Sequence, residues 1–280
     1  MPYGTWIIRE IESPKGYVLS EEEIAVTIGK VDEVVEIELV NYFIKGNIAL
    51  TKVDEDYPDN KLSGAVFEVY SDTNDDGKLD KDDTLLGEMK ELDGGVYQMS
   101  ELRYGKYLVK ETKAPTGFVL DENVYSVSVE ENGKTYTVEN KAGVGFINAA
   151  QKGSLKIVKT SSDGKVEGFS FRVTGVDYDQ TFKTDKNGEI VIEGLRIGDY
   201  TVSEVSDKAS AGYILPADKQ ATVKVDATAI VQMHNEFRDT PKTGDDFNLG
   251  LWVSLAALSV VGAGVLGFVG YKNRKKKKED

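Results

Sequence analysis

The sequence predicts an all-β protein made of tandem modules, followed by one C-terminal transmembrane helix. Glycine occurs 28 times in 280 residues, and alternating runs of Val, Ile, Tyr and Phe are separated by turn residues, which is typical of short strands. One strand motif recurs at a spacing of roughly 95–100 residues, which indicates tandem modules rather than one large core. Long helical periodicity is absent before residue 249.

The recurring strand ends in a glutamate in each of its three copies, at residues 1–10, 102–111 and 195–204. Each copy has Gly six residues before the glutamate, an aromatic residue four before it and Ile or Val two before it. Side chains alternate along a strand, so the aromatic residue, the β-branched residue and the glutamate share one face. The apolar residues mark this face as buried, where an unpartnered carboxylate is costly.

Residues 1–45 resemble the C-terminal half of a truncated module. They contain the recurring strand, a turn at residues 13–16 and a closing strand expected at residues 34–42, but no front half. A charged and then apolar signal peptide is missing at the start. We therefore expect this chain to be the C-terminal part of a longer secreted protein.

Residues 46–148 form a complete predicted module, and residues 153–236 repeat its plan more compactly. In the first of these, strands are expected at residues 48–52, 64–69, 105–111, 125–129 and 144–148, with a turn at residues 114–117. In the second, the matching opening, second, recurring and closing strands are expected at residues 154–159, 168–173, 198–204 and 230–235.

Each complete module places a lysine and an asparagine, besides the glutamate, on apolar strand faces. The period of two puts Lys52 with Ile48 and Leu50, and Asn148 with Phe146. The same rule gives the sets Lys52, Glu111, Asn148 and Lys159, Glu204, Asn235, and the half-set Glu10, Asn41. Glu10 and Asn41 are 31 residues apart, as are Glu204 and Asn235, whereas Glu111 and Asn148 are 37 apart. The larger gap predicts a longer loop in that copy, with Asn140 as a weaker alternative partner.

Burial predicts the chemistry of these residues. Desolvation lowers the pKa of a lysine and raises that of a glutamate, so the pair can exist as neutral amine and neutral acid. A neutral amine is a nucleophile, and a protonated glutamate can hydrogen-bond the asparagine carbonyl and transfer protons. Attack on that carbonyl expels ammonia and leaves a Lys–Asn amide. Three unrelated ion-paired or exposed residues on misjudged strands are the alternative, but the repetition of the set favours the cross-link.

These modules resemble the Cna protein B-type, or SpaA-type, domains of Gram-positive pilins and adhesins. The resemblance covers residues 1–236 and rests on the Lys, Glu and Asn sets and on the strand pattern G-x-[YW]-x-[VI]-x-E. It implies immunoglobulin-like, prealbumin-like β-sandwich modules with intramolecular isopeptide bonds from Lys52 to Asn148 and from Lys159 to Asn235, promoted by Glu111 and Glu204. The first module departs from the pattern because it has no lysine strand, so Glu10 and Asn41 cannot complete a bond within it.

A cross-link between the terminal strands has a mechanical consequence, because tension can then pass through the covalent bond. By analogy with disulfide closure of a loop of about 100 residues, it stabilises the module by about 4–5 kcal/mol. The chain has no cysteine. The isopeptide bond is therefore the staple that we expect in place of disulfides.

An acidic loop fits the twelve-residue calcium-loop pattern, with Gly77 at the turn. It departs from the pattern at its last position, where Asp83 replaces the usual Glu, and no helices are expected beside it. We expect this loop to bind Ca²⁺, and the alternative is a solvated acidic loop. No cofactor is expected to be required. The predicted ligands are Asp72, Asn74, Asp76, the Lys78 carbonyl, Asp80 and Asp83.

The C-terminal region resembles a sortase sorting signal of the LPxTG type. Residues 237–248 form a polar linker, residues 249–271 carry no charge over 23 residues, enough to span a bilayer, and residues 272–280 form a basic tail. The alternative is a plain single-span membrane protein. The motif residues are Thr240, Pro241, Lys242, Thr243 and Gly244, and Thr240 departs from the usual leucine. The resemblance implies cleavage after Thr243 and transfer of its carboxyl group to peptidoglycan or to another pilin subunit.

Charge and composition exclude several functions. Residues 1–248 carry a net charge of −18, which argues against nucleic acid as a partner. His234, the only histidine, is expected to point outward, and with no cysteine the chain offers no persuasive catalytic triad. We therefore expect a non-enzymatic stalk of a secreted, cell-wall-anchored Gram-positive surface protein, either a pilin-like subunit or an adhesin stem. The alternatives are an adhesin module that binds a host extracellular-matrix protein or glycan, and spacer domains of a surface enzyme whose catalytic part lies upstream.

Overall fold

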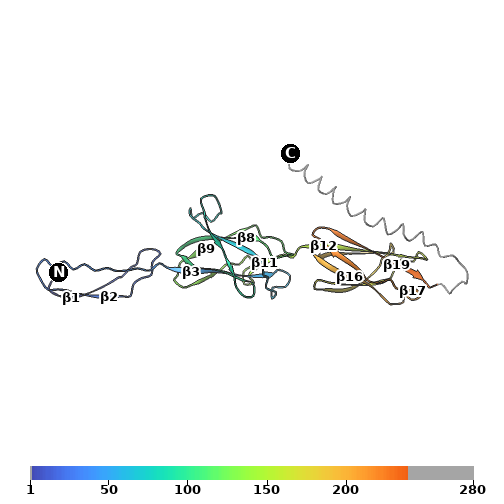
Figure 1. The fold of residues 1–280 in the computed structure, drawn as a ribbon, viewed down its shortest axis with the longest axis horizontal. Coiled ribbons are helices and arrows are strands. Elements are labelled where there is room, and N and C mark those ends of the chain that lie inside the picture. The colour runs from blue at the N-terminus through green and yellow to red at the C-terminus, as the bar shows by residue number, and fades with distance from the viewer. Residues whose placement is uncertain (1, 239–280) are drawn as a thin grey trace, which may run out of the picture.

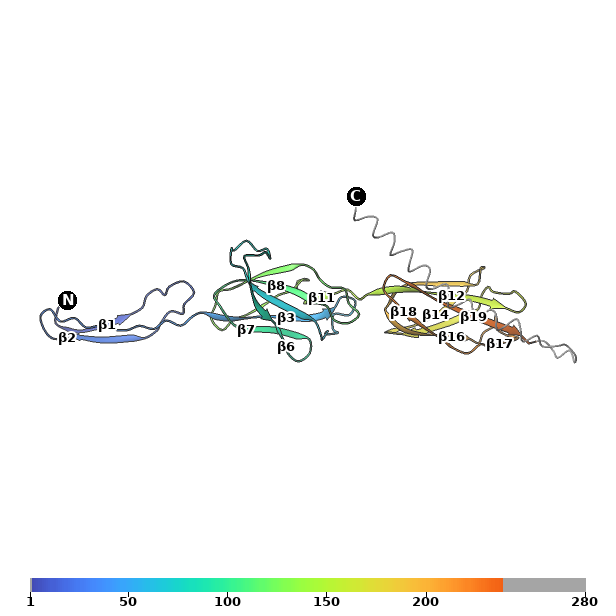
Figure 2. The ribbon, with the colours of Figure 1, turned by 45° about the horizontal axis from the view of Figure 1, so that its top comes forward.

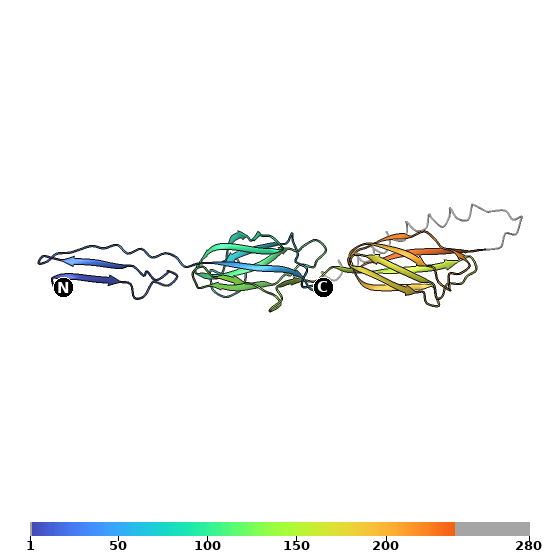
Figure 3. The ribbon, with the colours of Figure 1, turned by 90° about the horizontal axis from the view of Figure 1, so that it is seen from below.

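A computed structural model of the chain describes residues 2–238, and all regular secondary structure in that range is β-strand (Figure 1). The described part is elongated, with three strand-containing bodies arranged end to end (Figures 1–3). The prediction of an all-β chain is confirmed for these residues. No helix long and apolar enough to cross a membrane occurs between residues 2 and 238. The predicted sorting motif at residues 240–244, the span at 249–271 and the tail at 272–280 lie outside the described residues.

The second module is a sandwich of two sheets. One sheet has the order β10-β3-β7-β6, with β11 also paired to β3, and the other has the order β5-β4-β8-β9. Its strands are β3 Lys45–Asp54, β4 Val66–Ser71, β5 Thr84–Glu88, β6 Lys90–Glu91, β7 Val96–Arg103, β8 Gly105–Lys113, β9 Val124–Val129, β10 Thr135–Thr137 and β11 Phe146–Asn148.

The third module repeats this sandwich, with sheet orders β15-β12-β19-β17 and β14-β13-β16-β18. The opening strand β12 and the closing strand β19 lie side by side and parallel over eight residue pairs. Its strands are β12 Lys152–Ser161, β13 Ser170–Gly175, β14 Tyr178–Lys183, β15 Glu189–Arg196, β16 Gly198–Val205, β17 Tyr213–Ile214, β18 Lys219–Val223 and β19 Thr228–Phe237.

Alternation along the strands builds both cores. In β3, Ile48 and Leu50 are fully buried, and Phe67 of β4 packs against them from the facing sheet. In β12, Leu155 and Ile157 are fully buried and share a core with Phe171 of β13. The period-two pattern therefore identified the inward faces correctly.

The closing strand of the second module is interrupted. β10 and β11 both run parallel to β3, but Thr135 pairs with Asn47 whereas Phe146 pairs with Lys52. The register offset is thus 88 residues at β10 and 94 at β11, so six extra residues bulge out within the strand. They account for the longer gap between Glu111 and Asn148, which was expected to be a longer loop. The closing strand, expected to start at residue 144, is short because its first part is β10.

The first module is a half-sandwich with only two strands, β1 Gly4–Arg9 and β2 Glu23–Ile28, paired with each other. The closing strand predicted at residues 34–42 is wrong, because residues 33–42 form no strand and only Phe43 bridges to Tyr17. In the complete modules the closing strand pairs with the opening lysine strand, and residues 2–44 contain no such strand. The apolar side chains of the segment 33–42 accordingly remain exposed, including Val34 at 84% and Ile37 at 38%.

Candidate functional site

The candidate site of the second module lies in the middle of its core. Lys52 near the end of β3 and Asn148 at the end of β11 come from one sheet, and Glu111 near the end of β8 faces them from the other. All three side chains are buried, with exposed fractions of 0% for Lys52 and Glu111 and 3% for Asn148. The alternation of each strand turns these polar residues inward beside the apolar ones, as the sequence predicted.

The contacts within this site connect the three residues directly. Lys52 Nζ contacts Asn148 Oδ1 and lies 3.5 Å from Glu111 Oε1. Asn148 Nδ2 donates to Glu111 Oε1 at 3.1 Å and to Oε2 at 2.9 Å, and also to the Val119 carbonyl at 2.7 Å. The amine therefore lies against the side-chain amide group that it is proposed to attack.

The environment of Lys52 favours its neutral, nucleophilic form. Burial lowers the pKa of Lys52 from 10.5 to about 8, and the negative charge of Glu111 opposes this shift. The ammonium also lies 4.7 Å from the centroid of the Phe146 ring. A lysine pKa near neutrality leaves a reactive fraction of free amine under physiological conditions.

The orientation of the asparagine amide differs from the expectation. We expected the glutamate to hydrogen-bond the asparagine carbonyl, but Glu111 accepts from the amide nitrogen of Asn148, and the carbonyl oxygen faces Lys52. The nitrogen is the leaving group in amide exchange. In this arrangement a protonated Glu111 would be placed to give a proton to that nitrogen.

The corresponding residues of the third module occupy the same strands. Lys159 comes from β12, Asn235 from β19 and Glu204 from the facing β16. Lys159 is 1% exposed and Asn235 is 0% exposed. Asn235 Nδ2 donates to Glu204 Oε1 at 2.6 Å, which repeats the amide-to-acid contact of the second module.

The lysine of the third module has a different partner. Lys159 Nζ donates to the backbone carbonyl of Thr160 and lies 4.2 Å from the centroid of the Phe169 ring. Asn235 Oδ1 and Glu204 Oε2 are consequently buried without a hydrogen-bond partner. Such orphaned atoms are costly, and among residues 2–238 these are the only two buried side-chain oxygen or nitrogen atoms in that state.

The pKa shifts in the third module have the directions predicted for a buried pair. Burial lowers the pKa of Lys159, although the charge of Glu204 opposes the shift. Burial also raises the pKa of Glu204, although its hydrogen bond from Asn235 opposes that shift. Both shifts favour the neutral forms of the two groups.

The half-set of the first module is also brought together. Asn41 Nδ2 donates to Glu10 Oε1 at 2.6 Å, and the Ser20 amide donates to Glu10 Oε2 at 2.7 Å. The second module has the matching backbone bond, from the Asp121 amide to Glu111 Oε2 at 2.8 Å. The hydrogen bond from Asn41 lowers the pKa of Glu10, opposite to the shift of the buried Glu204.

Sequence reasoning missed several residues around the site. The Asp121 amide donates to Glu111. The Asp121 carboxylate accepts hydrogen bonds from Tyr125 at 2.7 Å and from Asn140 at 2.8 Å. Asn140, the alternative partner in the prediction, thus binds Asp121 and the Ile147 backbone rather than Glu111. A usable signal is the constant spacing of ten residues from Glu111 to Asp121 and from Glu10 to Ser20.

The predicted calcium loop forms a turn at Gly77, whose φ is 73°. Its carboxylates accept hydrogen bonds from amides of the same loop, including Gly77 to Asp72 at 3.0 Å and Asp80 to Asp83 at 2.9 Å. Within residues 2–238, no three His, Cys, Asp or Glu side chains are grouped so that they could hold a metal ion. Calcium binding by this loop stays a prediction.

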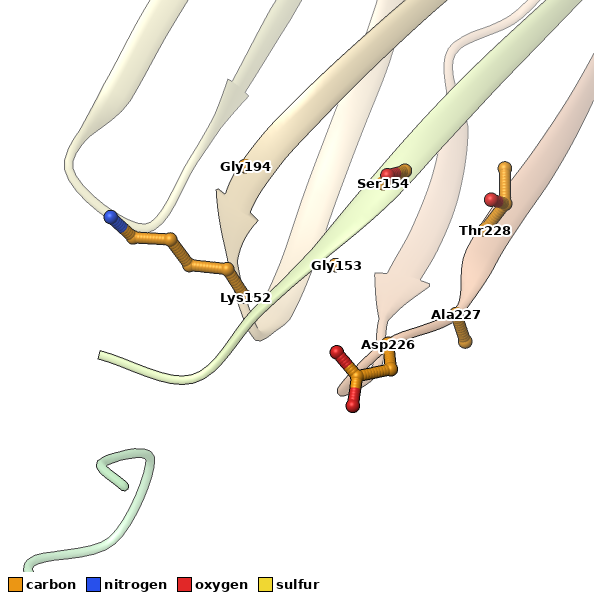
Figure 4. Close-up of a pocket in the computed structure, with 7 residues that line it drawn as sticks. All are labelled: Lys152, Gly153, Ser154, Gly194, Asp226, Ala227 and Thr228. Atoms are coloured by element: carbon orange, nitrogen blue, oxygen red, sulfur yellow. The ribbon is translucent and has the colours of Figure 1, made fainter. Parts of the chain in front are cut away.

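A hollow at the start of β12 offers no comparable chemistry (Figure 4). The Lys152 side chain extends away from Asp226, and glycines and small residues form the rest of its lining. His234 points outward as predicted, where it contacts Thr160 Oγ1 and Glu236.

Comparisons with known proteins identify the fold. A family model described as a SpaA prealbumin-like fold domain matches residues 1–42, 46–142 and 153–237. No curated protein sequence matches the chain.

Among solved structures, the Bacillus anthracis TIE protein is 26% identical, with a TM-score of 0.64; the match covers 85% of this chain and 42% of that one. This chain therefore spans less than half the length of that protein. A streptococcal ancillary pilin is 19% identical, with a TM-score of 0.32 and coverage of 85% of this chain and 76% of that one. The minor pilin GBS52 of Streptococcus agalactiae is 18% identical, with a TM-score of 0.32 and coverage of 72% and 100%. The family match spans most of the sequence, and the chain belongs to the SpaA prealbumin-like fold domain family.

Proposed function

We propose that this chain is a structural stalk of a Gram-positive surface protein, either a pilin-like subunit or an adhesin stem, stabilised by intramolecular Lys–Asn isopeptide bonds. One observation carries the proposal. Two modules each bury a lysine of the opening strand and an asparagine of the closing strand in one core, and a glutamate faces them, which is buried at Glu111 and half-buried at Glu204. Buried lysine and glutamate are rare unless they are paired, so their repetition supports a common chemical role.

The proposed reaction is an amide exchange that needs no external reagent. Lys52 Nζ first loses its proton to Glu111, which lies 3.5 Å away. The neutral amine attacks Asn148 Cγ, a C–N bond forms, and the bond from Cγ to Nδ2 breaks. Glu111 returns the proton to Nδ2, which donates hydrogen bonds to this carboxylate, and then takes up the second proton that the new amide nitrogen gives up. One ammonia leaves for each bond formed, and Glu204 acts in the same way for Lys159 and Asn235.

The position of the bonds supports a load-bearing role. Each bond joins the opening strand to the closing strand, which lie parallel and adjacent in the sheet. Tension that enters along β3 therefore passes from Lys52 to Asn148 and on to β12, and residues 53–147 are excluded from the path. Removal of loop-closure entropy from the unfolded chain adds about 4–5 kcal/mol for a loop of this size.

Glu10 and Asn41 form the acid and amide parts of a third site. Their contact at 2.6 Å equals that of Glu204 and Asn235. We propose that they accept a lysine from a strand that is not among residues 1–45. The module of which residues 1–45 are the back half would then be cross-linked like the other two.

Covalent attachment to the cell surface is the second part of the proposal. Residues 240–244, the apolar residues 249–271 and the basic tail occur in the order of a sorting signal. A sortase would cleave after Thr243 and join its carboxyl group to peptidoglycan or to another pilin subunit. The chain would thus be held transiently in the membrane and finally in the cell wall. Substitution of Thr243 by alanine in cells should move the protein from the cell-wall fraction to the membrane fraction, and retention in the wall would contradict this part.

No specific observation favours the ligand-binding alternative. Between residues 46 and 236, Tyr57 is the one large aromatic side chain that is more than 36% exposed, and it is stacked near Arg196. Residues 46–236 therefore lack the exposed aromatic patch that a host-protein or glycan site would favour.

Peptide mapping of the full chain tests the cross-links. After trypsin digestion, we expect branched peptides that join the segment containing Lys52 to that containing Asn148, and Lys159 to Asn235. The Lys52→Met variant should lose the first branched peptide and keep the second. Recovery of Lys52 and Asn148 only in linear, unmodified peptides would contradict the proposal.

A further inference from the structure

The joint between the second and third modules is built around one arginine. Arg196, at the end of β15, reaches out of the third module and donates to both oxygens of Asp54 in the second module, at 2.6 Å and 2.8 Å. It also donates to Asp56 at 3.0 Å. Paired, parallel hydrogen bonds of this kind fix the relative orientation of the two groups as well as their separation.

The ion pair at this joint is shielded from water, unlike the surface pairs of the molecule. The exposed fraction is 15% for the Arg196 side chain and 2% for Asp54. The guanidinium also lies 4.9 Å from the centroid of the Tyr57 ring and 5.8 Å from that of Phe118. Aromatic rings on a desolvated guanidinium add cation–π attraction and exclude solvent.

Further contacts close the joint around the connecting residues 149–151. Lys152 Nζ lies 3.1 Å from Asp56, and the Ile197 amide donates to the Gln151 carbonyl at 3.1 Å. The ion pairs of Arg196, the ion pair of Lys152 and the hydrogen bond of the Ile197 amide thus connect the third module to the second module or to the connecting segment. The segment is also short, which limits the angles that it allows.

Asp54 couples the joint to the proposed cross-link. It lies two residues after Lys52 on the same strand face and pairs in register with Asn148. The Glu55 amide also donates to the Asn148 carbonyl at 3.1 Å. The carboxylate that holds Arg196 therefore lies on the strand pair that the proposed cross-link joins.

The same sequence position is used at the preceding joint. Arg103 matches Arg196 in the recurring strand motif, and its guanidinium carbon lies 3.9 Å from the centroid of the Phe43 ring. The Tyr104 amide donates to the Ile44 carbonyl at 3.0 Å, as the Ile197 amide does to Gln151. The turn that precedes the recurring strand thus contacts the segment just before the opening strand at both joints.

We propose that Arg196, its acceptors Asp54 and Asp56, and the neighbouring rings of Tyr57 and Phe118 form an interaction surface that holds the second and third modules as one rigid unit. We call this surface the lock. Arg196 belongs to neither proposed cross-link, so its substitution removes the lock without removing a cross-linking residue. A stalk with fixed joints transmits orientation as well as tension along its length.

Distance measurements between two spin labels test the lock in the full chain, held in detergent because of its apolar segment. The chain has no cysteine, so labels can be attached at Lys90→Cys in the second module and Thr181→Cys in the third, both at exposed positions. We expect one narrow distance distribution for the otherwise unchanged chain and loss of the narrow peak in Arg196→Ala. Arg172→Ala is the matched control, since it removes an exposed pair to Asp179 within the third module at 2.5 Å and should leave the peak narrow.

A second variant separates loss of the lock from local unfolding. Arg196→Ala leaves Asp54 buried without its partner, whereas the double variant D54N/R196A removes both charges. Broad distributions in both variants support the lock. A narrow distribution in either of them, or a broad one before any substitution at the joint, would overturn it. Intact mass measured on the same samples reports the cross-links separately.

Discussion

The second and third modules place the same three residues at the same strand positions but connect them differently. In the second module Lys52 contacts the asparagine oxygen and lies 3.5 Å from the glutamate. In the third, Lys159 turns to the Thr160 carbonyl and leaves Asn235 Oδ1 and Glu204 Oε2 unpaired. The asparagine-to-glutamate hydrogen bond is present in both.

This difference shows which part of the site the fold determines. Strand register fixes the positions of the glutamate and the asparagine, because each has a short side chain on a paired strand. The lysine has four rotatable methylene bonds and can reach either the amide or a backbone carbonyl from the same Cα. Burial therefore creates the requirement for a partner, and the lysine conformation decides whether the reacting atoms meet.

Loss of a cross-link should have the largest effect in both modules. We expect Lys52→Met and Lys159→Met each to lower the free energy of unfolding of their module by about 4–5 kcal/mol, because the closed loop no longer restricts the unfolded chain. Chemical denaturation of the full chain measures this. Asn140→Ala, which disturbs the second module without touching the proposed bond, should cost only about 1–2 kcal/mol. An equal loss in Asn140→Ala and Lys52→Met would contradict the assignment of Asn148.

Replacement of the acids comes next and tests whether the two sites share one mechanism. Glu111→Gln and Glu204→Gln keep a hydrogen-bonding side chain but cannot transfer a proton, so each bond should form about 10²–10⁴-fold more slowly. Intact mass, followed over time as newly synthesised chain first folds in a cell-free translation reaction, measures the rate for each variant and for the unchanged chain. Unchanged bond formation in Glu204→Gln would show that the third site works without its acid.

The pH dependence of an uncross-linked module isolates the buried lysine. In Asn148→Ala, Lys52 stays a free amine, and burial lowers its pKa from 10.5 to about 8. The unfolded state then holds a proton that the folded state has lost between pH 8 and 10.5, so the free energy of unfolding should rise with pH across that window. Lys52→Met, which has no amine at this position, is the control. Identical pH profiles of the two variants would contradict a buried free lysine.

The smallest expected difference between the second and third modules is the order in which their bonds form. Lys159 must leave the Thr160 carbonyl before it can attack Asn235, whereas Lys52 already contacts Asn148. We expect the third module to lose its ammonia after the second when newly synthesised chain first folds in a cell-free translation reaction, as read by peptide mapping of quenched samples. Earlier reaction at Asn235 would show that the lysine contact does not control the rate.

Much of the fold followed from the sequence because β-alternation is a local property. The period of two correctly predicted that Lys52, Lys159 and Glu111 lie on inward faces. The three-fold repetition of the strand motif predicted the three modules. The closing strand at residues 34–42 was wrong because strand formation needs a partner strand, and the pattern of a segment says nothing about whether that partner is present.

The details that the sequence did not predict depend on long-range contacts. The bulge between β10 and β11 changes the register of the closing strand against β3. In the sequence its six residues appeared only as a larger gap between Glu111 and Asn148, which predicted a longer loop without its position. The joint at Arg196 and Asp54 connects residues 142 positions apart. A hint existed, since Asp54 continues the inward period of Ile48, Leu50 and Lys52 by one step, but its partner belongs to another module.

The intact mass of the full chain tests the central claim most directly, with Lys52→Ala, Lys159→Ala and the double variant measured beside it. We predict a deficit of two ammonias in the unchanged chain, one in each single variant and none in the double variant. A chain with its full calculated mass would contradict the isopeptide bonds, and the buried lysines would then be ordinary core residues.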